Sequence, residues 1–236
     1  YALQGQRNAI DKFLKGKNIP ASSYHEGAEL LLMWPKTGKH SVVIVASTLT
    51  KLHKLCASIV TSDAGQTFYI FHSFELHKNF AAPGSNIKLI DYDPSDYASF
   101  AKKIGSVKAD ALVMANEDVD WSSLSSKSLD NLAGWLNVDG VVAAGPRVTE
   151  HNSKIALDCG ALVTSEGLRP LFWQSPPYHQ TPIGNIEWVR NLNVVSAHLL
   201  VVNKAAAVAE LEKVLRANVG ADFLLPALQL QLAKQA

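Results

Sequence analysis

This sequence has few cysteines, no long apolar run and no excess of charge of one sign. Its two cysteines, Cys56 and Cys159, cannot form a disulfide framework or a zinc site by spacing, and their apolar surroundings predict that both are buried. No apolar run approaches the roughly 20 residues that span a bilayer. The 22 basic and 21 acidic residues leave a net charge of +1 with no dense Lys/Arg block, so charge indicates neither nucleic acid nor an anionic membrane as a partner.

What the chain does contain is enough apolar material for a full core. Of its 236 residues 47% are hydrophobic and 18% charged, which fits a globular protein with one large α/β domain or two small ones. Tyr1 follows neither an initiator Met nor a signal-like segment, so we expect a domain excised from a longer protein of a reducing compartment.

Strand-like and helix-like segments alternate through the first part of the chain. Apolar or β-branched runs predict strands at 41–46, 67–71, 87–92, 109–116 and 140–144. Helical spacing of apolar residues predicts helices at 50–62, 94–107 and 125–136. This alternation predicts an α/β fold, with a mainly parallel, Rossmann-like sheet flanked by helices.

The ends of the chain differ from this pattern. Residues 4–14 and 28–34 predict a short helix and strand preface. Residues 155–172 are β-rich, and the proline-containing segment 173–193 predicts a long loop. A strand at 193–202 and helices at 205–215 and 223–233 complete the prediction. We expect a preface at 1–40 and one domain at 41–236, with a nucleotide half near 41–120 and an acceptor half near 121–236.

The segment ADALVMANEDVD (109–120) is the strongest local signal for a binding site. A short apolar run ends abruptly in Asn116, Glu117 and Asp118, so these side chains are expected at the carboxyl end of a buried strand, where open α/β sheets bind ligands. Carboxylates there suit a divalent cation that carries a phosphorylated substrate. The alternative is an ordinary strand followed by a solvated acidic turn.

Several further motifs occur in a characteristic order. They are MWP (33–35), SVVIVAS (41–47), LHKLCASIV (52–60), KKIGSVKADALVMANED (102–118), DGVVAAGPRV (139–148), LDCGALV (157–163) and SAHLLVV (196–202). In this order they resemble the family-2 glycosyltransferases with a GT-A fold, particularly the branch that builds bacterial O-antigen and other surface polysaccharides. The resemblance covers nearly the whole chain, and it implies a GT-A-like fold.

The resemblance also implies a donor site and a metal site. Asp118, with Asn116, would hold Mg²⁺ or Mn²⁺ on the diphosphate of a nucleotide-sugar. The remaining positions that match the donor site are Ser47, Thr48, His72, Lys102 and Glu117.

This chain differs from the family at the donor-binding carboxylates and at the catalytic base. Active relatives carry donor-binding carboxylates in the turns that correspond to 46–49 and 71–74, and neither turn contains one here. The family's catalytic base falls at Pro226 and Ala227, which cannot remove a proton. Asp120 and Asp222 are the substitutes that remain, although neither lies at the matching position.

The second half contains residues suited to the acceptor side. Trp173 and Trp188 could stack on sugar rings, although core packing explains them equally well. Tyr178 and His179 lie in the long proline-containing loop. His198 interrupts an apolar strand, which is typical of a core or cleft-lining histidine as well as of a ligand-binding one.

Two hypotheses follow from different classes of function. The favoured one is a degenerate, non-catalytic GT-A module that acts as a scaffold or binding unit with other domains of a larger polysaccharide-assembly protein, and needs no cofactor. The alternative is an active, inverting, metal-dependent transferase that takes a nucleotide-sugar and a glycan acceptor. A dinucleotide oxidoreductase is disfavoured because no Gly-x-Gly-x-x-Gly follows an early strand. We expect a cytoplasmic location, or peripheral attachment to the inner membrane through other domains or partners.

Overall fold

The structure is a computed structural model. The residues it describes are 21–24, 30–32, 39–62, 65–77, 80–137, 141–150, 152–176, 180–181, 184–185, 192, 194–217 and 224–233.

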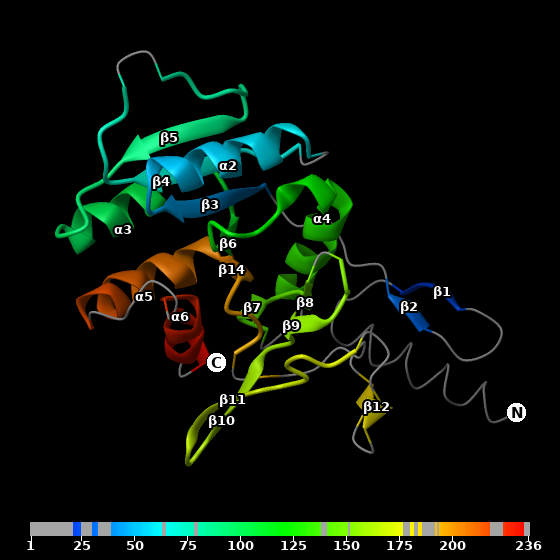
Figure 1. The fold of residues 1–236 in the computed structure, drawn as a ribbon. Coiled ribbons are helices and arrows are strands. Elements are labelled where there is room, and N and C mark those ends of the chain that lie inside the picture. The colour runs from blue at the N-terminus through cyan, green and yellow to red at the C-terminus, as the bar shows by residue number, and fades with distance from the viewer. Residues whose placement is uncertain are drawn as a thin grey trace, which may run out of the picture.

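A six-stranded sheet forms the centre of the molecule (Figure 1). Its order is β5-β4-β3-β6-β14-β7. The strands are β3 (His40–Ala46), β4 (Phe68–His72), β5 (Ile87–Asp91), β6 (Ala111–Ala115), β7 (Ala143–Ala144) and β14 (Leu199–Asn203). Every residue of β4 and β6 is buried, as their continuous apolar sequences predict.

The direction of the strands defines one special edge of this sheet. Strands β3, β4, β5 and β6 are parallel, while β14 runs antiparallel to both β6 and β7. From β3 the chain moves outward through β4 to β5 and then returns to the other side of β3 as β6. The order therefore reverses between β3 and β6, and their carboxyl ends flank the topological switch point where such sheets bind ligands.

Helices cover both faces of the sheet. On one face α2 (Leu49–Val60), η1 (Trp121–Ser123) and α4 (Ser126–Gly134) pack around the buried Trp121, whose ring contacts Phe68 edge-to-face. Short η2 (Trp135–Asn137) extends α4. On the other face α3 (Tyr97–Gly105), α5 (Lys204–Arg216) and α6 (Leu224–Ala233) pack over a second apolar cluster.

Side-chain caps fix where the helices begin. Thr48, Asp96, Ser125 and Asn203 each accept a hydrogen bond from a backbone N–H in the first turn of the helix that follows. Each cap satisfies a donor that the helix itself leaves unpaired. The cap at Thr48 also fixes the direction in which α2 leaves the switch point.

The remaining strands form small two-stranded sheets. They are β1 (Ala21–Tyr24) with β2 (Leu30–Leu32), β8 (Val148–Thr149) with β9 (Ala156–Asp158), β10 (Ala161–Thr164) with β11 (Gly167–Pro170), and β12 (Gln180–Thr181) with β13 (Gly184–Asn185). The β10–β11 hairpin extends away from the central sheet (Figure 1).

The predicted α/β class, with a mainly parallel sheet flanked by helices, is confirmed. Two details differ from the sequence predictions. Strand β14 begins at Leu199 and not near residue 193, because Ser196 and its neighbours form a hydrogen-bonded turn. Cys159 is only half-buried, unlike Cys56. The predicted helix at 4–14 lies outside the described residues, and the domain boundaries stay predictions.

Within the described segments, we find no helix whose length and apolar character together would let it cross a membrane.

Candidate functional site

The carboxyl ends of β3 and β6 meet at the switch point, where Asn116, Glu117 and Asp118 form what we call the β6 tip. Strand β6 pairs with β3 from His40↔Ala111 to Ile44↔Ala115. This register places the residues after Ala115 beside the start of α2. The sequence prediction that the acidic cluster follows a buried strand at the sheet edge is therefore confirmed.

Glu117 binds back to the end of β3. One of its carboxylate oxygens accepts a hydrogen bond of 2.7 Å from the backbone N–H of Ser47, and the other accepts one of 2.7 Å from the Ser47 hydroxyl. Both oxygens of Glu117 are thus engaged by one residue 70 positions away in the sequence. Bonds to a carboxylate are among the stronger hydrogen bonds in proteins.

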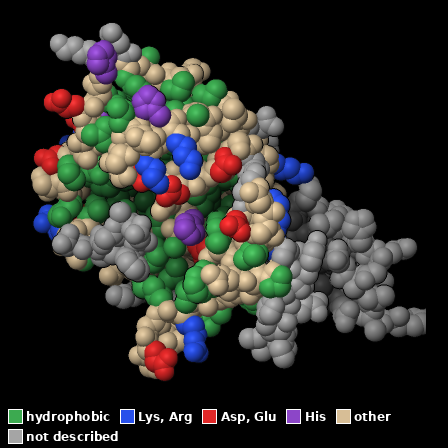
Figure 2. Space-filling view, viewed as in Figure 1, with side chains coloured by type: hydrophobic (Ala, Val, Ile, Leu, Met, Phe, Trp, Pro, Cys, Tyr) green, Lys and Arg blue, Asp and Glu red, His purple; other side chains and the backbone are tan. Residues whose placement is uncertain are grey.

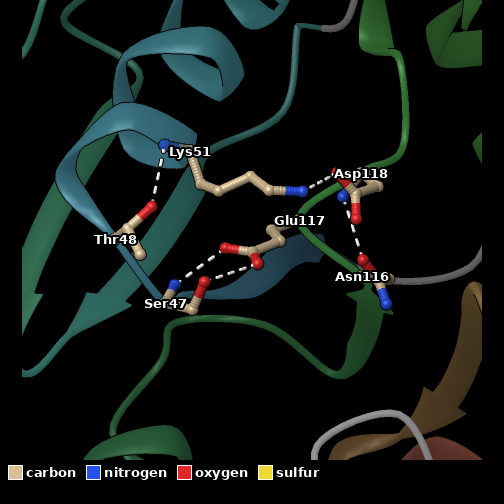
Figure 3. A network of polar contacts seen from close by, with 6 residues as sticks. All are labelled: Ser47, Thr48, Lys51, Asn116, Glu117 and Asp118. Atoms are coloured by element: carbon tan, nitrogen blue, oxygen red, sulfur yellow. Dashed lines mark hydrogen bonds and ion pairs between the residues drawn. The ribbon is translucent and has the colours of Figure 1, made fainter.

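Asp118 forms an ion pair with Lys51 in the first turn of α2 (Figure 3). The ammonium of Lys51 donates a hydrogen bond to Asp118, and this bond, together with the carboxylates of Asp118 and Glu117, raises the pKa of Lys51. The Asp118 side chain is 56% exposed, so water competes for this pair and its strength is modest. The Lys51 side chain extends from α2 toward Asp118 in the loop after β6 (Figure 3).

Asn116 makes hydrogen bonds both within the tip and to the segment before β14. Its side-chain oxygen accepts a 2.9 Å bond from the N–H of Asp118, and its backbone N–H donates to the carbonyl of His198 at 2.8 Å. The first bond makes an Asx turn, which sends the chain sharply away from β6. The second ties the tip to the segment that enters β14.

The other predicted donor-site residues do not converge on the tip as a group. Thr48 accepts from the N–H of Lys51 as the cap of α2. His72 is 5% exposed, and its Nδ1 lies 3.1 Å from the carbonyl oxygen of Phe74. Lys102 is exposed on α3. The structure thus gives Thr48 and His72 local structural bonds.

The candidates for a catalytic base also have structural roles where they are described. Asp120 accepts bonds from the N–H and hydroxyl of Ser122 and caps η1. Pro226 and Ala227 lie within α6. The predicted residue Asp222 lies outside the described residues.

Of the predicted acceptor-side residues, the structure describes Trp173 and His198. Trp173 is 62% exposed. His198 is half-buried, and its backbone carbonyl accepts a hydrogen bond from the N–H of Asn116 at the β6 tip. The core-packing alternative for Trp173 is therefore wrong. Tyr178, His179 and Trp188 lie outside the described residues.

A second polar cluster, which was not predicted from the sequence, joins α6 and β9 to the segment that enters β14. Gln229 of α6 accepts from the N–H of Val195 and donates to the carbonyl oxygens of Ser196 and Leu225. Asp158 of β9 accepts from the Ser196 hydroxyl at 3.0 Å and from the N–H of Ala197 at 2.6 Å. We call Asp158, Ser196 and Gln229 the Ser196 junction.

The junction and Lys51 share a reason for being missed. Apart from local bonds such as that of Gln229 to Leu225, their contacts join segments from 33 to 67 residues apart in the sequence, and no local spacing encodes them. The one available signal was the presence of polar Ser196 and Gln229 within strongly apolar segments. Such residues usually have hydrogen-bond partners when buried.

The described part of the surface shows no region dominated by one sign of charge on the face drawn in Figure 2. Acidic and basic side chains are interspersed on the face shown in Figure 2. Among the residues with described positions, no three or more His, Cys, Asp or Glu side chains are grouped so that they could hold a metal ion.

No protein-family model and no curated protein matches the chain. Solved structures of similar fold include a 4-diphosphocytidyl-2C-methyl-D-erythritol synthase from Anaerococcus prevotii, with a TM-score of 0.40 and 11% identity over 79% of this chain and 80% of that one. The glycosyltransferase GlyE of Streptococcus pneumoniae has a TM-score of 0.41 and 12% identity, and covers 84% of this chain but 44% of its own. HddC of Yersinia pseudotuberculosis has a TM-score of 0.35 and 13% identity over 74% and 78%. Likeness this distant is no basis for assigning an activity.

Proposed function

We propose that the chain is a degenerate GT-A-like glycosyltransferase domain with a non-catalytic scaffold or binding role. The observation that carries this proposal is the way α2 engages the β6 tip. Ser47 binds both carboxylate oxygens of Glu117, and Lys51 pairs with Asp118. The acidic residues that first indicated a metal site are bound to the protein's own donors.

The residues at the tip do not fit a divalent cation in this arrangement. Magnesium and manganese require several free oxygen ligands in near-octahedral geometry. Both Glu117 oxygens and the Asn116 side-chain oxygen accept hydrogen bonds, and Asp118 lies against the Lys51 ammonium. A positive charge at that position repels a second cation. We therefore propose that no metal cofactor acts at this site.

The rest of the inherited site supports the same conclusion. The turn at Ser47 lacks a carboxylate, and His72 at the end of β4 is buried against Phe74. The helix expected to supply the base carries Pro226 and Ala227. An active enzyme would need a separate replacement for each of these groups, whereas a scaffold or binding module needs none.

The biological setting comes from the sequence resemblance alone. We propose that the domain works beside other domains or subunits of a surface-polysaccharide assembly protein of the O-antigen type, at the cytoplasmic side, either free or peripheral to the inner membrane. Its direct partners would be those domains and a glycan.

Calorimetry with nucleotide-sugars tests the proposal. UDP-, GDP- and TDP-sugars are titrated into the wild-type protein with Mn²⁺ or Mg²⁺, and donor hydrolysis is followed in parallel. We expect no saturable, metal-dependent heat and no hydrolysis. The matched variants are Asp118→Ala at the tip and Asp93→Ala, an exposed aspartate that is bonded to Ser95 instead.

The competing function is an active, metal-dependent transferase. The exposure of Asp118 favours it, because an ion pair that water reaches could yield to a cation. Saturable donor binding that requires metal and is lost in Asp118→Ala but kept in Asp93→Ala would establish that function and refute the degenerate one.

A further inference from the structure

Most of the exposed large apolar side chains come from one stretch of the sequence. In the described residues, seven large hydrophobic side chains are exposed, and five of them lie between residues 157 and 173. They are Leu157, Leu162, Val163, Leu168 and Trp173. Trp173 is the most exposed of the seven, at 62%. Val163 and Leu168 are cross-strand partners on one face of the β10–β11 hairpin, whereas Leu162 lies on the other face. The five therefore do not form a single patch, and Trp173 is considered by itself.

The backbone around Trp173 is fixed and strained. The residues on either side, Phe172 and Gln174, have φ values of 53° and 57°, in the left-handed region that non-glycine residues rarely adopt. Four backbone hydrogen bonds of 2.8 to 2.9 Å hold this shape, joining Leu171 to Gly160, Gln174 and Ser175 to Ala156, and Ser175 to Phe172. Strain held in place by surrounding structure is a signature of functional positions.

The fixed loop belongs to the same framework as the candidate site. It runs along residues 156–160, and Asp158 in that stretch binds Ser196 and the N–H of Ala197. The next residue, His198, accepts the N–H of Asn116 at the β6 tip. Trp173 is therefore presented by a segment that the Ser196 junction ties to the tip.

We propose that Trp173 is a preformed stacking platform for a neutral carbohydrate chain. This proposal rests on the binding role proposed above and specifies where its ligand binds. The face of an indole buries the apolar C–H face of a pyranose ring. The neighbours Gln174 and Ser175 offer uncharged hydrogen-bonding groups, as a ligand rich in hydroxyl groups requires, and Gln174 is itself exposed. A platform that is already ordered loses little conformational entropy when the sugar binds.

The test uses neutral hexasaccharides that carry no nucleotide. Maltohexaose, cellohexaose and chitohexaose are each titrated into the full chain, and binding is followed by calorimetry and by the indole N–H signals in nuclear magnetic resonance spectra. We expect saturable binding of at least one hexasaccharide. The indole N–H signal of Trp173 is identified as the one that is absent from the spectrum of Trp173→Ala, and in the wild type this signal should shift when the hexasaccharide binds. Trp173→Ala weakens binding about tenfold or more, and Trp173→Phe retains most of it.

Val60→Ala is the matched control, because Val60 is 54% exposed on α2, away from the loop. It should bind as the wild type does. The proposal is overturned if no hexasaccharide binds saturably, or if Trp173→Ala binds as well as the wild type. It is also overturned if sedimentation shows that Trp173→Ala dissolves a dimer, since the surface then serves a second copy of the chain. None of these failures affects the donor-site proposal, which is tested with nucleotide-sugars.

Discussion

The β6 tip and the Ser196 junction are two polar clusters that join distant parts of the chain, yet they differ in their exposure to water. At the tip, Asn116 and Glu117 are half-buried and the Asp118 side chain is 56% exposed. At the junction, Ser196 is fully buried, Gln229 is 3% exposed and Asp158 is half-buried. A buried polar group must be bonded by the protein itself, whereas an exposed one can exchange its partner for water. We therefore expect the junction to contribute more to the stability of the fold than the tip does.

This comparison also explains the arrangement of the site. The junction fixes residues 195–199, and His198 then fixes Asn116 through one backbone bond. The polar contacts of the tip thus rest on a buried support. Substitutions at the junction should therefore lower the stability of the fold by a large amount, and substitutions at the tip by a small amount.

The largest effect is expected for Gln229→Leu. This change leaves the N–H of Val195 and the carbonyl oxygen of Ser196 without the bonds that Gln229 provides, and should lower the free energy of unfolding by about 3 kcal/mol. Urea unfolding measures it. Gln66→Leu is the control, because Gln66 is also buried but its side-chain oxygen has no hydrogen-bond partner. Equal losses in the two variants would contradict the assigned role of the junction.

A smaller loss is expected for Asp158→Ala. Its carboxylate accepts bonds from Gly160, Ser196 and Ala197, and its removal should lower the free energy of unfolding by about 2 kcal/mol. The exposed Asp93 also accepts two bonds, both from Ser95, and Asp93→Ala should leave the urea midpoint almost unchanged. The comparison fails if Asp93→Ala is as damaging as Asp158→Ala.

His40 provides a pH-dependent test of burial at the other end of β3. Burial lowers the pKa of His40, against the opposing effect of Asp130, whose carboxylate lies 3.7 Å away. The unfolded chain then takes up this proton at a higher pH than the folded one. The stability contributed by His40 is present above about pH 6.5 and is lost as the pH falls toward the lowered pKa.

Urea midpoints at pH 7.5 and 5.5 measure this dependence. His40→Gln should reduce the loss on acidification, whereas His53→Gln, at an exposed position on α2, should leave it unchanged. An undiminished loss in His40→Gln would show that other groups cause it.

The smallest stability effect is expected at the β6 tip. The double variant Ser47→Ala with Lys51→Ala removes the side-chain contacts to Glu117 and Asp118, but water replaces them. The urea midpoint should not change measurably. A clear drop would place the tip with the junction as a structural cluster.

The sequence predicted the sheet better than it predicted the site. Apolar runs located β3, β4 and β6 to within two residues, because buried parallel strands read as continuous hydrophobic segments. The apolar run at 193–202 predicted a strand that begins too close to the N-terminus, since the partner of Ser196 in the turn before β14 lies 38 residues away at Asp158. Periodicity reports local structure and does not report such contacts.

The position of the acidic tip was also predictable, but its chemistry was not. Strand composition and the run of Asn116, Glu117 and Asp118 placed carboxylates at the sheet edge. Whether those carboxylates face a ligand or the protein's own donors depends on Ser47 and Lys51, which only the folded chain brings to them.

Electron paramagnetic resonance of Mn²⁺ tests the central claim most directly, because it reports the free ion as the wild-type protein is titrated. We predict that adding the protein leaves the free Mn²⁺ signal unchanged. When a nucleotide-sugar is present, the signal should fall only by the amount that the nucleotide-sugar binds in the absence of protein. Asp118→Ala should behave as the wild type does. If the wild type reduces the free Mn²⁺ signal and Asp118→Ala does not, the claim that Ser47 and Lys51 occupy the carboxylates of the acidic tip is contradicted.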